Sequence, residues 1–216
     1  MKILKRAYPF EKLIFQDKLL KEFTINFQQA IECIIEGKTE LASNFKEEMI
    51  KNKTEIDNYS LLVCFQNSAK GAGSSLYYLY LQYKIQITAK MSSVLDWILT
   101  RQSPINSDSI ETELFVLADS AAETIEKLTI LSSELSKASK RFKNKKAKKS
   151  AAKLIDEIIE KSKKTYDLSL RMKRKILETE TNPASLTHLV FLADMIGYIG
   201  EKTRDCVWVA SSLISL

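Results

Sequence analysis

Long stretches of this chain repeat their apolar residues at the spacing of an α-helix. In the first stretch, Leu13, Leu20, Phe27 and Ile34 recur every seven residues, which is the pattern of a helix that packs along one side in a bundle. Glycine and proline, which tight turns between strands require, supply only 5 and 3 of the 216 residues. The sequence therefore predicts a fold of a few long helices with few connections.

The same periodicity divides the chain into six predicted helices. The clearest break is the linker from Arg101 to Ser107, which contains Pro104 and leaves three helices on each side. We expect an all-α protein of two three-helix bundles of long antiparallel helices, 1–101 and 108–216, packed as one compact unit. Apolar and polar residues also alternate between Leu81 and Ser92, so a strand there is an alternative. The predicted helices run from about Phe10 to Glu36, Thr39 to Ala69, Ser74 to Thr100, Asp108 through at least Leu135, Ala147 to Thr179 and Asn182 to Leu213.

The two halves also match each other weakly at an offset of 111 residues. The matched pairs are Leu81 with Leu192, Ile85 with Ile196, and Trp97 with Trp208. A repeated three-helix unit explains these matches, and chance agreement between helices rich in Leu and Ile is the alternative.

The net charge of +6 comes from one basic cluster. The segment from Lys137 to Lys149 holds eight Lys or Arg residues and no acid. We expect it to form the turn between the fourth and fifth helices, either as a solvated loop or as a surface for nucleic acid or anionic lipid headgroups. Its candidate binding residues are Lys143, Lys145, Lys146, Lys148 and Lys149.

Four tyrosines crowd the start of the third predicted helix, at Tyr77, Tyr78, Tyr80 and Tyr83. At helical spacing they point in different directions, so some of them should be exposed or lie in an interface. Tyr77 and Tyr80 are the candidates for such a binding surface, and ordinary surface tyrosines are the alternative.

Cysteine usage and hydropathy favour a cytoplasmic protein. Cys33, Cys64 and Cys206 stand far apart and form no C-x-x-C pair, and an odd number argues against a disulfide framework. The stretch from Asn58 to Tyr83 carries a single charge, but polar and glycine residues interrupt it. Its uncharged pieces are shorter than the ~18–20 apolar residues that span a bilayer.

Carboxylates on the predicted helices could bind a metal ion. Glu201 and Asp205 are four residues apart and share a helix face with Asp194, whereas Asp57 and Asp167 occupy matching places in the two halves. Facing helices that each offer carboxylates can bind a hard cation. The alternative is that these side chains are ordinary solvent-facing charges.

The string from Asp194 to Asp205 resembles the signature helix of the PhoU-like family, the helical-bundle regulators of phosphate transport. That family places Ile-Gly or Ile-Ala two residues after an acidic residue, and then a metal-binding Asp followed by Asn or Asp four residues on. Asp194 and Ile196-Gly197 match this pattern, but Tyr198 and Lys202 replace the last two positions.

The earlier helices match the family less well. Glu55-Ile56-Asp57 resembles its Glu-Ala-Asp motif, and only Asp167 matches in the second half. The first half also lacks the acids of the signature helix, where it has Tyr83, Ile87 and Met91.

The resemblance implies a non-enzymatic, cytoplasmic regulator or adaptor of phosphate uptake that binds a membrane phosphate transporter from the cytoplasmic side. Peripheral membrane association and homo-oligomerisation remain open. If a metal ion binds, the candidate ligands are Asp57, Asp167, Asp194 and Glu201. Tyr198 and Lys202 at the two replaced positions supply no carboxylate or amide oxygen, and Lys202 adds an ammonium group. We therefore expect weak or absent metal binding. The alternative function is a helical scaffold that binds nucleic acid through residues 137–149.

Overall fold

The computed structural model describes residues 13–67, 72–101, 105, 107–140 and 145–215. These residues form six α-helices and no strand, which confirms the all-α prediction. The strand alternative for Leu81–Ser92 is wrong, because these residues lie inside the third helix. The predicted helix ends at Phe10 and Ala69 lie outside the described residues. The helices are α1 (Leu13–Ile35), α2 (Thr39–Asn67), α3 (Ala72–Leu99), α4 (Asp108–Lys140), α5 (Lys145–Thr179) and α6 (Pro183–Ser215).

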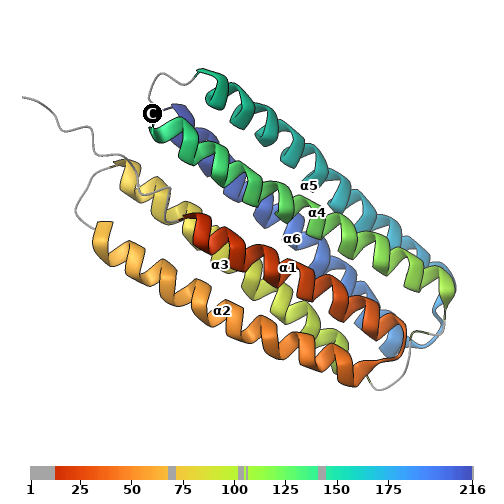
Figure 1. Cartoon of the computed structure of the whole chain (residues 1–216). Helices are drawn as coiled ribbons and strands as arrows, with labels where there is room; N and C mark the ends of the chain where they lie inside the picture. The colour runs from red at the N-terminus through yellow and green to blue at the C-terminus, as the bar shows by residue number, and fades with distance from the viewer. Residues whose placement is uncertain (1–12, 68–71, 102–104, 106, 141–144, 216) are drawn as a thin grey trace, which may run out of the picture.

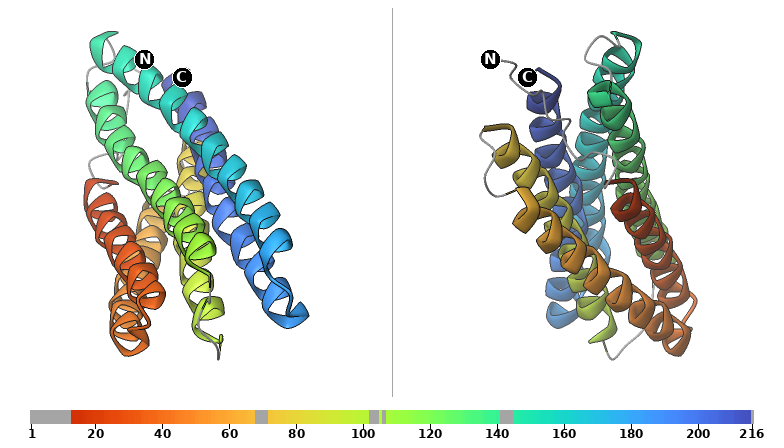
Figure 2. Two further views of the ribbon diagram at one scale, coloured as in Figure 1. Left: turned by 90° about the vertical axis from the view of Figure 1, so that its right-hand side faces the viewer. Right: turned by 60° about the vertical axis from the view of Figure 1, so that its left-hand side comes forward.

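The helices are arranged as two three-helix bundles, α1 to α3 and α4 to α6 (Figures 1 and 2). The bundles meet where α1 packs against α4 and α3 against α6. α3 and α6 run antiparallel: Trp97 near the end of α3 bonds to His188 near the start of α6, and Tyr80 near the start of α3 bonds to Cys206 near the end of α6. One hydrophobic cluster extends through both bundles.

The predicted repeat agrees with the helix positions at α3 and α6. These helices begin 111 residues apart, at Ala72 and Pro183. Leu81 and its match Leu192 are both buried. The tryptophan pair differs, because Trp97 is half-buried whereas Trp208 is 58% exposed.

Local sequence signals explain two of the short turns. Gly37 has a φ of 75°, a left-handed conformation that glycine adopts without strain, and it ends α1. Asn182 caps α6, because its side-chain oxygen accepts hydrogen bonds from the backbone N–H groups of Ala184 (2.9 Å) and Ser185 (3.2 Å).

α5 and α6 approach closely because small residues line their contact. A Cβ atom at Gly197 would lie 2.7 Å from the Ser169 hydroxyl oxygen, and one at Gly200 would lie 3.1 Å from Cβ of Thr165. The glycine of the Ile196-Gly197 pair therefore has a packing role in this chain.

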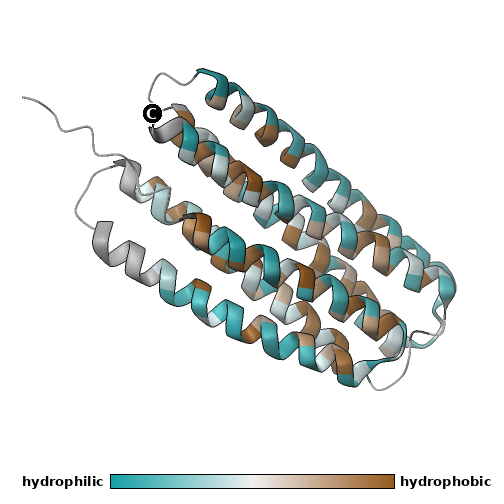
Figure 3. Ribbon diagram, in the orientation of Figure 1, coloured by the Kyte–Doolittle hydropathy of each residue, from teal (hydrophilic) through white to brown (hydrophobic). Residues whose placement is uncertain are grey.

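The outer faces of the bundle are polar and its interior is apolar (Figure 3). α5 illustrates the pattern, since its apolar residues repeat at helical spacing and bury one face only. The buried apolar residues of α5 include Ile155, Ile158, Leu168, Met172 and Ile176. In the part of the chain that the structure describes, no helix is both long and apolar enough to cross a membrane.

Candidate functional site

The predicted metal ligands lie apart, and two of them are bound by lysines. Asp57 on α2 accepts a hydrogen bond from Lys53 at 2.5 Å, and Asp194 on α6 accepts one from Lys173 of α5, also at 2.5 Å. α2 and α5 lie on opposite outer sides of the molecule (Figure 1), so Asp57 cannot meet Asp167.

The other two candidate ligands, Asp167 and Glu201, lie on α5 and α6. Asp167 lines a depression of about 570 Å³ together with four lysines and two glutamates. Lysines therefore outnumber carboxylates there by four to three, a charge balance that disfavours a cation. Glu201 is half-buried on α6. Among the described residues, no three His, Cys, Asp or Glu side chains gather in a way that could hold a metal ion. The four candidate ligands therefore do not come together in the part of the chain that the structure describes, and metal binding at any one of them stays a prediction.

The two replaced signature positions form a cluster of lysines and tyrosines between α3 and α6. The Lys202 ammonium lies 5.1 Å from the centroid of the Tyr198 ring and 5.5 Å from that of Tyr83. Lys90 of α3 lies 5.0 Å from the Tyr198 centroid. These are cation–π distances, and a hydrogen bond to Asp205 (2.9 Å) raises the pKa of Lys202. An ammonium group thus stands where the family pattern calls for a ligand, and the residues present do not fit a metal cluster.

Tyr77 and Tyr80 are buried, so the prediction that they form a binding surface is wrong. Tyr80 points into the interface between the two bundles, where its hydroxyl lies 2.7 Å from that of Ser132 on α4. Of the other two tyrosines, Tyr78 is exposed and Tyr83 is half-buried. The exposed residues are Tyr78 and Leu79, the immediate neighbours of the two predicted ones, because one step along a helix rotates a side chain by about 100°.

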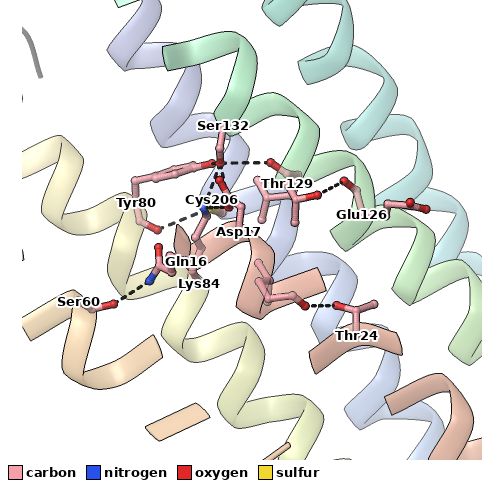
Figure 4. A network of polar contacts seen from close by, with 12 residues as sticks. Gln16, Asp17, Thr24, Ser60, Tyr80, Lys84, Glu126, Thr129, Ser132 and Cys206 are labelled. Carbon is pink, nitrogen blue, oxygen red and sulfur yellow. Dashed lines mark hydrogen bonds and ion pairs between the residues drawn. The ribbon is translucent and has the colours of Figure 1, made fainter. Parts of the chain in front are cut away.

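A charged network lies buried where α1, α3 and α4 meet (Figure 4). The Lys84 ammonium forms an ion pair with the Asp17 carboxylate and donates a hydrogen bond to the Ser132 hydroxyl at 3.0 Å. The same ammonium lies 4.8 Å from the centroid of the Tyr80 ring. Lys84 has no exposed surface, and buried lysines are rare unless they are paired.

Burial dominates the electrostatics of this network. It raises the pKa of Asp17, although the neighbouring Lys84 opposes the shift. It also raises the pKa of the Tyr80 hydroxyl and of the Cys206 thiol, whose sulfur lies 3.6 Å from the Tyr80 carbonyl oxygen. The second oxygen of Asp17 and the side-chain oxygen of Gln16 have no hydrogen-bond partner among the described residues. A thiol and a phenol held protonated and away from solvent are poor nucleophiles.

The predictions from the sequence do not include this network, although the spacing of the apolar residues places its members at core positions. Gln16 and Asp17 fall between Leu13 and Leu20 on the buried seam of α1, and Lys84 follows Leu81 by three residues. A charge at a position that the periodicity assigns to the core predicts a buried, paired charge.

The basic cluster lies at the predicted turn, since α4 ends at Lys140 and α5 begins at Lys145. Lys145, Lys146 and Lys149 are exposed, whereas Lys148 donates a hydrogen bond to the backbone carbonyl of Ile214 at 3.0 Å. Lys143 lies outside the described residues. The cluster's role as a binding surface remains a prediction.

Solved structures share this fold. No protein-family model and no curated protein matches the sequence. A PhoU-like phosphate regulatory protein from Shewanella oneidensis MR-1 superposes with a TM-score of 0.81, over 96% of this chain and 99% of that one. A PhoU-like protein from the same organism gives a TM-score of 0.84 over the same shares of both chains. Each is 14% identical in sequence to this chain, and the six helices described above have the PhoU-like fold.

Proposed function

We propose that this protein is a non-enzymatic regulator of phosphate uptake that binds the cytoplasmic side of a membrane phosphate transporter. The observation that carries the proposal is the fold, which agrees over nearly the whole of both chains with structures described as PhoU-like. The signature-like segment from Asp194 to Asp205 adds independent support from the sequence.

The chemistry of the polar groups supports a non-enzymatic role. Three titratable groups whose pKa values are raised by burial, Asp17, Tyr80 and Cys206, lie in the buried network between the bundles. Catalytic groups must reach a substrate within hydrogen-bond distance, and the burial of these side chains denies that access. A polar network of this kind fits a structural role in joining the bundles.

The flank of α6 beside α3 offers a surface for a protein partner. Phe191, Tyr198 and Trp208 are 53%, 41% and 58% exposed, and they point to the same side of the helix within about a third of a turn. Exposed aromatic residues are enriched at the centres of protein interfaces. We propose that this aromatic stripe contacts the transporter directly, without a bridging metal cluster.

A deletion strain of the source organism tests the proposed function. Deletion of the gene should alter the difference in the rate of phosphate uptake between phosphate-rich and phosphate-poor medium. Expression of the wild-type protein should restore the wild-type difference. The triple variant F191S/Y198S/W208S should fold but fail to restore it. Unchanged uptake in the deletion strain would contradict the proposed function, and full rescue by the triple variant would contradict the proposed surface.

A further inference from the structure

The helix ends gathered at one end of the bundle lack acidic residues. α2, α4 and α6 end there, and α3 and α5 begin there (Figures 1 and 2). The sequence has one charge between Asn58 and Tyr83, which is Lys70, and no charge from Cys206 to Leu216. Between Lys137 and Lys149 it has eight basic residues and no acid. The fold brings the described parts of these segments (58–67, 72–83, 137–140, 145–149 and 206–215) to one end of the molecule, which we call the basic end.

The opposite end of the molecule carries both signs of charge. α1 connects to α2 there, α3 to α4, and α5 to α6. Its acids lie at the helix ends and turns, at Glu36, Glu40, Asp108, Glu111 and Glu180. The absence of acids is therefore specific to the basic end and is not a property of the helix ends in general.

The lysines at the start of α5 have no structural partner that explains them. Lys145, Lys146 and Lys149 are exposed, and none forms an ion pair with a carboxylate among the described residues. The first turn of α5 contains no acid. Its unpaired N–H groups already place partial positive charge at this point, so lysines here destabilise the helix. Residues that destabilise their own helix and have no compensating contact are typical of functional sites.

Apolar side chains accompany this positive charge. Tyr78 and Leu79 near the start of α3 are 48% and 40% exposed. Tyrosine and tryptophan favour the headgroup level of a bilayer, and clustered lysines favour its anionic lipids. Nucleic acid would use the positive charge but would gain little from uncharged, apolar helix ends, so these observations favour a membrane surface.

We propose that the basic end binds an anionic lipid bilayer, with the α5 lysines on headgroup phosphates and the uncharged ends of α3 and α6 at headgroup depth. The molecule would then stand end-on against the membrane. This inference goes beyond the proposed function, because it requires no transporter.

Vesicle sedimentation with the full-length chain tests the proposal. The protein should bind vesicles of phosphatidylcholine with phosphatidylglycerol far more tightly than vesicles of phosphatidylcholine alone. The variant K145Q/K146Q/K149Q should lose affinity by a factor on the order of 100, at roughly 1 kcal/mol for each lysine near the surface. Its melting temperature should be unchanged or slightly raised, because the removed charges oppose the helix dipole.

Matched controls separate the basic end from general charge. K163Q/K164Q/R174Q removes three exposed basic residues from the same helix and should bind nearly as well as the wild type. Ser212→Glu at the basic end of α6 should weaken binding roughly fivefold, whereas Thr187→Glu at the other end of α6 should not. Equal binding to both vesicle types, or equal losses in the two triple variants, would overturn the proposal. Tighter binding of a short DNA duplex or single-stranded RNA at the same salt would overturn it in favour of nucleic acid.

Discussion

At the scale of single residues, the buried ion pair of Asp17 and Lys84 is the least expected feature of the molecule. Lys84→Met should destabilise the protein by about 3–5 kcal/mol, because it leaves the buried carboxylate of Asp17 without its partner. The double variant D17L/K84M should recover most of this loss. Leu and Met are the residues that the second half carries 111 positions later, at Leu128 and Met195, both buried.

Urea unfolding of the wild type, the two single variants and the double variant measures this coupling. A double variant as unstable as Lys84→Met would contradict the argument, since it would show that the core needs the polar network itself.

The single histidine should make the stability depend on pH. His188 Nε2 donates a hydrogen bond to the Trp97 carbonyl oxygen at 2.9 Å, and the two rings stack with centroids 4.8 Å apart. Burial lowers the pKa of His188 from its usual 6.5. The imidazole of His188 therefore binds a proton more readily in the unfolded chain than in the folded chain. The stabilisation that neutral His188 provides is fully present above pH 6.5 and is lost as the pH falls towards the lowered pKa.

Two measurements check the histidine. The only imidazole signal in a proton NMR titration should have a midpoint below pH 6.5, and His188→Gln should show a flatter loss of stability between pH 7 and 5. A midpoint above 6.5 would contradict the assigned environment.

The replaced signature positions predict weak or absent metal binding. Lys202 places an ammonium group beside Tyr198, and Lys173 already binds the Asp194 carboxylate. We expect well under one metal ion per chain by elemental analysis of purified protein. Stoichiometric iron or zinc that disappears in Asp194→Ala would show that the carboxylates do bind the family's metal.

At the scale of helices, the contact between α5 and α6 should be sensitive to a single methyl group. Gly197→Ala gains about 1 kcal/mol of helix propensity, but its Cβ would lie 2.8 Å from Cβ of Ser169, and such overpacking costs about 1–3 kcal/mol. A net loss is expected at Gly197. Gly200→Ala should lose less, because its Cβ would lie 3.1 Å from Cβ of Thr165 and 3.2 Å from the Ser162 carbonyl oxygen, milder crowding that roughly offsets the gain in helix propensity.

Thermal unfolding of both variants, of S169G and of the double variant G197A/S169G checks this packing. The serine replacement should be less damaging in the G197A background than in the wild type. Purely additive effects would show that the two side chains do not compete for the same space.

At the scale of the whole molecule, the sequence predicted the architecture well. Helical periodicity and the scarcity of glycine and proline indicated six helices, and the linker after Arg101 separated the two bundles. The side chains were harder to place. The sequence predicts Tyr77 and Tyr80 at the surface, because periodicity within one helix cannot show that α3 is covered by α6 as well as by its own bundle.

The candidate sites were predicted less well, for a related reason. Asp57, Asp167 and Asp194 match the family-like pattern in sequence position. Lys53 pairs with Asp57 from four residues away on one helix, but only the packing shows that Lys173 binds Asp194 and that α2 and α5 lie on opposite sides. Lys173 reaches Asp194 from a different helix. A contact of that kind depends on the packing of two helices, which one helix's pattern does not contain.

Direct contact between the aromatic stripe of α6 and a phosphate transporter is the central claim, and site-specific photo-crosslinking in living cells tests it most directly. A photoreactive phenylalanine would replace Tyr198 in one strain and Tyr166 in another, since these tyrosines are 41% and 42% exposed on different helices. We expect the probe at position 198 to crosslink to a subunit of a phosphate transporter, identified by mass spectrometry, and the probe at position 166 not to crosslink to one. Crosslinks from position 198 only to proteins unrelated to phosphate transport would contradict it.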